Sequence, residues 1–105
     1  MDLETIDKFI TFEHDRILKL YKIDKPKALR NQMVIKIMEE LGELSEQILA
    51  ADGLQRPDKL TKWESKAEKE VADVLITTLI LAKNMNLDVE KILEDGIKKR
   101  KDREY

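Results

Sequence analysis

The sequence contains no cysteine and few of the residues that interrupt helices. It has three glycines and two prolines among 105 residues, and only 5% of its residues are aromatic. The absence of cysteine excludes disulfides and thiolate chemistry, and it fits a reducing cytosol. Because glycine, proline and aromatic residues are all scarce, long helices are expected rather than a β-sandwich.

Two classes of partner are not indicated either. The 20 basic and 22 acidic residues give a net charge of −2, so no overall basic field suggests nucleic-acid binding. The longest apolar run, residues 74–82, contains two threonines and is too short to span a bilayer. The first residues lack the apolar core of a signal peptide. We therefore expect a cytoplasmic protein with no nucleic acid and no membrane among its partners.

Apolar residues recur at helical spacing along the chain, which predicts a single all-α domain over residues 1–105. Asp2, Thr61 and Asp88 are suited to cap helices, and Pro26 suits a first helical turn. The expected helices cover about residues 2–21, 27–52 and 61–84, with a linker at 54–60, a turn at 84–86 and a last helix after 88.

Residues 74–82 are apolar on nearly all sides of their predicted helix. A helix with this pattern is buried on most sides, and one small chain offers little to cover it. We therefore expect a four-helix bundle completed by oligomerisation, as a homodimer or a tetramer built from dimers. Residues 74–82 and part of the first helix should form the interface.

Five acidic residues form two sets on two predicted helices. Glu39, Glu40 and Glu43 lie on the second helix, and Glu70 and Asp73 lie three residues apart on the third. The first set alone is also explained as the solvated face of an amphipathic helix, opposite an apolar face. Together, on facing helices, the two sets would form a cation site.

Asp73 supports the cation-site hypothesis because it directly precedes the apolar residues 74–82. An ionised carboxylate beside a buried helix is unfavourable unless it is paired or bound to a metal. Lys66 and Lys69 are the candidate ion-pair partners in the simpler structural explanation. A metal ion is the other explanation.

The ligand chemistry points to a particular class of metal. Carboxylates with water suit Mg²⁺, with Mn²⁺ as the alternative, whereas zinc and copper sites use nitrogen and sulfur. A di-iron bundle needs Glu-x-x-His pairs, and the single histidine, His14, does not provide them. We expect His14 to lie on the surface.

The motif Glu39-Glu40-x-x-Glu43, 26 intervening residues and Glu70-x-x-Asp73 resembles the signature of MazG-like nucleoside triphosphate pyrophosphohydrolases. This all-α NTP pyrophosphatase superfamily also includes dimeric dUTPases and dCTP pyrophosphatases. The resemblance covers roughly residues 30–100. It implies Mg²⁺-dependent hydrolysis of an NTP or dNTP between the α and β phosphates, giving a nucleoside monophosphate and pyrophosphate. Many such enzymes act on non-canonical nucleotides in a house-cleaning role.

The resemblance also implies residue roles. Glu40, Glu43, Glu70 and Asp73 would bind the metal, and Glu39 would orient or deprotonate the attacking water. Basic side chains should hold phosphates that the metal does not cover. Lys36 shares the acidic face and is the first candidate, and solvation at the surface also explains all four candidates: Lys36, Lys69, Lys98 and Arg100.

One departure from the family pattern concerns the last helix. Family members often have an asparagine there that helps to hold the nucleotide, whereas residues 95–100 contain none. This difference motivates an alternative in which the chain is a non-catalytic helical module that binds a nucleotide or a protein through the retained acids.

Overall fold

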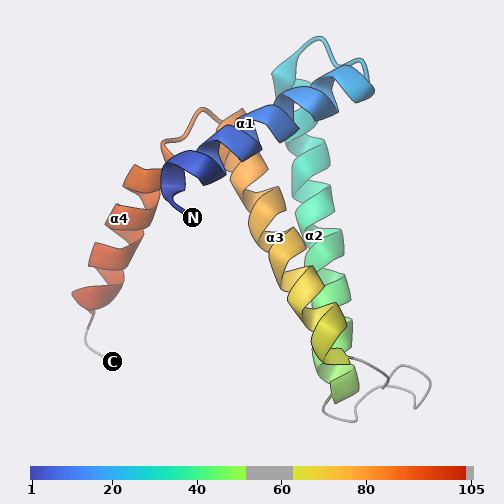
Figure 1. Cartoon of the computed structure of the whole chain (residues 1–105), viewed down its shortest axis with the longest axis vertical. Helices are drawn as coiled ribbons and strands as arrows, with labels where there is room; N and C mark the ends of the chain where they lie inside the picture. Colours follow the sequence, from blue (N-terminus) through green and yellow to red (C-terminus); the bar gives the residue numbers. More distant parts are fainter. Residues whose placement is uncertain (52–62, 104–105) are drawn as a thin grey trace. The chain divides into compact units, whose positions relative to one another are not determined.

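The computed structural model describes residues 1–51 and 63–103, and these residues form four helices and no strand (Figure 1). The all-α prediction is confirmed, while the expected linker and the Thr61 cap lie outside the described residues. None of the described helices is long and apolar enough to cross a membrane. The helices are α1 Leu3–Leu20, α2 Pro26–Ala51, α3 Trp63–Asn84 and α4 Val89–Lys101.

Local side-chain chemistry sets the helix boundaries as the sequence predicts. The Asp2 carboxylate accepts a hydrogen bond from the Thr5 backbone N–H at 2.9 Å, which caps α1. The Asp88 carboxylate caps α4 in the same way, accepting from the Lys91 N–H at 3.2 Å. Between α3 and α4, Asn86 adopts a positive φ of 58° and allows the predicted turn.

The chain divides into two compact units, which share the two long helices. Unit 1 consists of residues 1–30 and 79–105, and unit 2 consists of residues 31–78. Unit 1 therefore contains α1, α4, the start of α2 and the end of α3. Its buried apolar residues are Ile10, Leu29, Ile80 and Ala82, whereas Met33 is the buried apolar residue among those described in unit 2.

A buried polar network in unit 1 joins α1, α2 and α3 through Asn84, which is 4% exposed. Its amide nitrogen donates to the Pro26 carbonyl at 2.8 Å and contacts His14 Nε2 at 3.1 Å. Its amide oxygen accepts from Arg30 Nε at 3.1 Å, and Arg30 also donates to the Asn84 carbonyl. We call these four residues, His14, Pro26, Arg30 and Asn84, the asparagine network.

The partners fix the protonation of His14. Arginine only donates and a backbone carbonyl only accepts, so the Asn84 amide has one consistent orientation. His14 Nε2 must then accept, and the ring proton lies on Nδ1, which donates to Asp15 at 3.2 Å. The expectation that His14 lies on the surface is therefore wrong, since it is 7% exposed. A neutral histidine that is hydrogen-bonded at both nitrogens can be buried.

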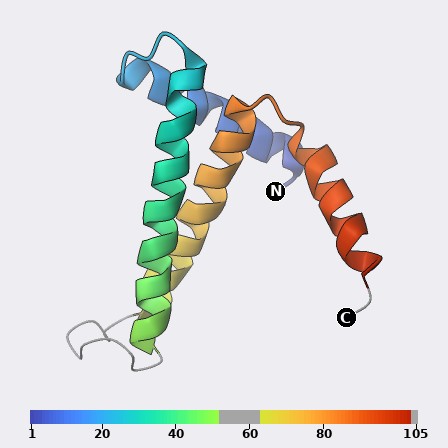
Figure 2. The same ribbon diagram turned by 180° about the vertical axis from the view of Figure 1, so that it is seen from behind.

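In unit 2, α2 and α3 lie side by side and run in opposite directions (Figures 1 and 2). A row of less exposed residues on this part of α2 recurs three or four positions apart, and this spacing places the row on one face of the helix. The row consists of Met33, Ile37, Glu40, Leu44 and Gln47, and Glu46 beside it is also partly buried.

This arrangement corrects the expected orientation of α2, in which the acidic set lies opposite the buried apolar face. Glu40 is buried within the chain, whereas the apolar side chain of Met38 is 67% exposed. The helix has apolar residues on two adjoining faces, and only one of them contacts α3. The exposed residues on the other face are Val34, Met38, Leu41 and Ile48.

Candidate metal site on α2 and α3

Three of the five predicted acids come together in unit 2. Glu40 and Glu43 are separated by one helical turn on α2, and Glu70 projects from the neighbouring α3. One carboxylate oxygen from each residue lies within 4.8 Å of those of the other two. We call these three residues the acid cluster. Glu40 is buried, Glu70 is partly buried and Glu43 is exposed.

The proximity of three carboxyl groups changes the acidity of Glu70. Burial, followed by hydrogen bonding to the Glu40 and Glu43 carboxyls and by their charges, raises the pKa of Glu70 to about 7. Each effect disfavours the ionised form, because a carboxylate loses water and meets like charges. Between about pH 4.5 and 7, Glu70 therefore holds more of its proton than an exposed glutamate does when no cation is bound.

Two oxygen atoms of the acid cluster have no hydrogen-bond donor. Glu40 Oε2 and Glu70 Oε2 are both buried and unpartnered. A buried acceptor without a donor is unfavourable by about 1–3 kcal/mol, and most such atoms in folded proteins are paired. These oxygens therefore need a positively polarised partner, such as a cation or water.

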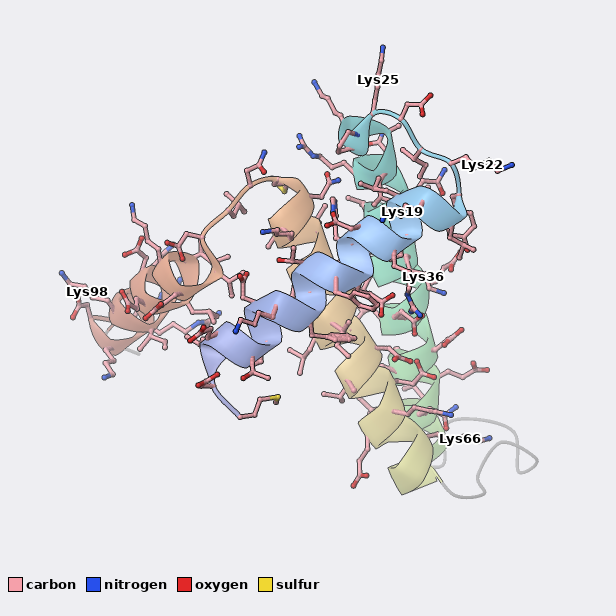
Figure 3. The ribbon with its side chains drawn as sticks, turned by 45° about the horizontal axis from the view of Figure 1, so that its top comes forward. Lys19, Lys22, Lys25, Lys36, Lys66 and Lys98 are labelled. Carbon is pink, nitrogen blue, oxygen red and sulfur yellow. The ribbon has the colours of Figure 1, made fainter. Side chains whose placement is uncertain are left out.

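Lys36 places a positive charge beside one carboxylate oxygen of Glu40. Its ammonium lies 3.1 Å from Glu40 Oε1 and 3.8 Å from Glu39 Oε2, one turn before the acids on α2 (Figure 3). The hydrogen bond and the charge of Glu40 raise the pKa of Lys36, so the side chain stays protonated. Lys36 is 54% exposed, and it leaves the second oxygen of Glu40 unpartnered.

The remaining predicted acids lie outside this group. Glu39 is exposed and pairs with Lys36, while Asp73 is partly buried. Among the described residues, no lysine or arginine forms an ion pair with Asp73. The alternative explanation of Asp73 through Lys66 or Lys69 therefore has no support in the described structure.

The other basic candidates for phosphate binding are exposed. Lys69 lies on α3 in unit 2, next to Glu70 in the sequence. Lys98 and Arg100 lie on α4 in unit 1, where Lys98 extends into solvent (Figure 3). Their role in phosphate binding stays a prediction.

The donor set fits a hard divalent cation. All three clustered ligands are carboxylates, and two buried oxygens have free lone pairs. Mg²⁺ and Mn²⁺ prefer such oxygen ligands, and a bound cation would neutralise the repulsion that raises the pKa of Glu70.

Comparison with known proteins places this acid pattern in a family. Residues 30–105 match the MazG nucleotide pyrophosphohydrolase domain. The chain belongs to this family. The match includes every acid of the sequence motif, and it begins within the first turns of α2, before the acid cluster. The MazG resemblance inferred from the five acids is thereby confirmed.

A curated relative of this MazG-family chain is the uncharacterized protein YpjD of Bacillus subtilis (strain 168). The two are 32% identical over 59 residues, which make up 56% of this chain and 52% of YpjD. The chain thus spans about half the length of the curated relative it matches. No solved structure matches the chain.

The sequence places Gln47 on the same helix face as the MazG acids, but it did not indicate that the amide oxygen is buried. Gln47 Oε1 is buried without a donor, like the two unpartnered carboxylate oxygens. Its spacing of seven residues from Glu40 places both on one helix face, and this signal was available in the sequence. The burial itself depends on α3, so the sequence pattern of α2 alone did not reveal it.

Proposed function

We propose that this chain is a Mg²⁺-dependent nucleotide pyrophosphohydrolase. It would cleave an NTP or dNTP between the α and β phosphates and release a nucleoside monophosphate and pyrophosphate, with non-canonical nucleotides as candidate substrates. The observation that carries the proposal is the acid cluster with its two buried, unpartnered oxygens. Membership of the MazG family supports the reaction class.

The proposed ligands of the metal are the acid cluster and Asp73. Asp73 lies one helical turn beyond Glu70 on α3, and it has no ion-pair partner among the described residues. When bound, Mg²⁺ neutralises the phosphate charge and lowers the pKa of coordinated water. The family match rather than a shared contact supports the inclusion of Asp73.

Glu39 is the proposed residue that handles the attacking water. Its carboxylate is exposed and lies beside Lys36, so it is held near the acid cluster and open to solvent. A carboxylate beside a water molecule can orient it and accept its proton during attack on phosphorus. Glu39 would therefore act as a general base and not as a principal ligand.

Lys36 is the strongest of the proposed phosphate-binding residues. Its ammonium is within reach of the acid cluster yet more than half exposed. It can therefore turn from Glu40 to a phosphate oxygen when a metal neutralises the carboxylates. Lys69, Lys98 and Arg100 are kept as secondary candidates because they are basic and exposed.

The test is release of pyrophosphate from a panel of NTPs and dNTPs in the presence of Mg²⁺. Glu70→Gln should lower kcat/KM by about 100-fold or more, because it removes a metal ligand. Glu68→Gln is the matched control, since Glu68 is an exposed acid on the same helix. Failure to release pyrophosphate from any nucleotide would contradict the proposal.

The panel also decides between catalysis and a binding module. The last helix lacks the asparagine that family members often use to hold the nucleotide, and this favours weaker turnover. Nucleotide binding in the presence of Mg²⁺ without pyrophosphate release would assign the chain to the non-catalytic alternative.

We further propose that the chain forms a homodimer, or a tetramer built from dimers. Large apolar side chains on both helices of unit 2 stay exposed, including Leu75 of α3 at 59% and Met38 of α2 at 67%. Exposed apolar surface of this extent is typical of association sites. A monomer in sedimentation at micromolar concentration would contradict this assembly.

A further inference from the structure

Gln47 lies on the face of α2 that contacts α3. It follows Glu40 by seven residues and Leu44 by three, so it continues the row of less exposed side chains. It also follows Glu43 by four residues, which is about 6 Å along the helix axis. A glutamine side chain is long enough to span much of that distance. Gln47 therefore borders the acid cluster on the side toward the end of α2.

The amide oxygen of Gln47 shares an unusual property with the acid cluster. The buried side-chain atoms without a partner in the described residues are Glu40 Oε2, Gln47 Oε1 and Glu70 Oε2. All three are oxygen acceptors, all belong to unit 2, and no buried donor is left unpaired beside them. A hydrated cation at the acid cluster would supply a partner to the two carboxylate oxygens and, through a water, to an amide oxygen on the same face of α2.

The hydration of the ion explains why a neutral amide accompanies three carboxylates. Mg²⁺ keeps several of its waters when it binds to proteins, and those waters are strong hydrogen-bond donors. An amide oxygen accepts such a bond without adding a further negative charge to the three carboxylates. A fourth acid in this place would add to the repulsion.

We propose that Gln47 is a positioning residue of the metal site, with its amide oxygen accepting a hydrogen bond from a water in the hydration shell of the ion bound by Glu40, Glu43 and Glu70. The inference rests on the proposed function, because it requires that the acid cluster binds a divalent cation. It assigns to Gln47 a role that the five-acid motif does not include.

The test is the affinity for Mn²⁺, measured by titration calorimetry and by the electron paramagnetic resonance of free Mn²⁺. Gln47→Met keeps the length of the side chain and removes the oxygen. It should weaken Mn²⁺ binding about 10-fold, in the range found for outer-shell partners of metal ligands. Gln32→Met is the matched control, because Gln32 is an exposed glutamine on the same helix, and it should bind as the unmodified chain does.

A second measurement separates positioning from a structural role. Without metal, Gln47→Met removes an unpartnered oxygen, so the melting temperature in a chelator should stay unchanged or rise. A loss of Mn²⁺ affinity together with a lower melting temperature in chelator would overturn the inference in favour of a packing role.

The outcomes also distinguish this inference from the proposed function. If Gln47→Met binds Mn²⁺ normally while Glu40→Gln does not bind it, the metal site stands and the role of Gln47 is wrong. If the unmodified chain binds neither Mn²⁺ nor Mg²⁺, the inference and the metal-dependent function both fail.

Discussion

In unit 1 the buried side chains of His14 and Asn84 have partners for their polar atoms, whereas in unit 2 the side chains of Glu40 and Glu70 each leave an oxygen without a donor. Both ring nitrogens of His14 have hydrogen-bond partners, and so do the amide nitrogen and oxygen of Asn84. These contacts join residues of three helices. Glu40 and Glu70 lie between two helices and each has one oxygen without a partner. A closed network is complete within the chain, while an open one needs a ligand. The difference separates a polar group that holds the fold from one that we propose binds a cation.

The largest expected effect is the loss of the closed network. Asn84→Ala leaves Arg30 Nε, His14 Nε2 and the Pro26 carbonyl without their partner. We expect a loss of about 3 kcal/mol in the free energy of unfolding, since each buried unsatisfied group costs about 1–3 kcal/mol. Urea denaturation measures it. Asn31→Ala, at an exposed site on α2, should change stability by less than about 0.5 kcal/mol.

The next effect concerns the acid cluster, which should gain stability when it binds Mg²⁺. At a free Mg²⁺ concentration about 100 times the Kd, binding should stabilise the folded chain by about 2.7 kcal/mol. Glu40→Gln should abolish most of this gain, because it removes a charge from the cluster. Thermal denaturation with Mg²⁺, compared with an equal ionic strength of a monovalent salt, measures the difference. Equal melting temperatures in the two salts would show that the acid cluster does not bind Mg²⁺, and the two units would then not differ in ligand binding.

The pH dependence of the stability of the metal-free chain tests whether the three carboxyl groups of unit 2 interact. The pKa of Glu70 is about 7 in the folded chain and 4.5 as an ordinary glutamate. The folded state therefore binds this proton more tightly, and the stability that it contributes is complete below pH 4.5 and is lost as pH rises through about 7. Glu70→Gln removes this dependence, so it should gain stability relative to the unmodified chain as pH rises over this range.

The measurement is thermal denaturation in chelator at a series of pH values. Glu68→Gln should follow the unmodified chain, because Glu68 is exposed and lies outside the acid cluster. Mg²⁺ should oppose the trend, since a metal binds the deprotonated carboxylate and displaces its proton. Parallel curves for Glu70→Gln and the unmodified chain would show that the three carboxyls do not interact in solution.

The smallest expected effect concerns Lys36, whose ammonium lies 3.1 Å from Glu40 of the acid cluster. Lys36→Met should change the free energy of unfolding by about 0.5 kcal/mol or less, because exposed ion pairs contribute little. If Lys36 binds phosphate, the same variant should raise the KM for nucleotides with less effect on kcat. Steady-state kinetics beside urea denaturation separate the two roles. A large loss of stability would make Lys36 a structural counter-ion of Glu40.

Much of the fold follows from short-range sequence signals. The Asp2 and Asp88 caps, Pro26 at the start of α2 and the turn at Asn86 all occur where the sequence predicts them. These features depend on neighbouring residues along the chain, so the sequence contains the whole of their cause. The metal-site hypothesis also rests on the spacing of acidic residues along two helices. The structure brings carboxylate oxygens of Glu40, Glu43 and Glu70 within 4.8 Å of one another, which agrees with that hypothesis.

The errors arose where burial depends on a second helix. The sequence of α2 presents two adjoining apolar faces, and periodicity does not say which one meets α3. The explanation of the first acidic set as a solvated face would leave Glu40 exposed, whereas the structure buries Glu40 and leaves Met38 exposed. His14 was expected on the surface because histidine is polar, but Asn84, 70 residues away in the chain, supplies the partner that allows its burial.

The sequence by itself determined four helices, the Asp2 and Asp88 caps and the acidic motif that identifies the family, because each depends on local spacing and residue type. The tertiary structure decided which polar atoms lose water and whether they find partners. It closed the network around Asn84 and left Glu40, Gln47 and Glu70 each with an unpartnered oxygen. The physical reason is that desolvation is a property of two packed surfaces, and one helix specifies only its own.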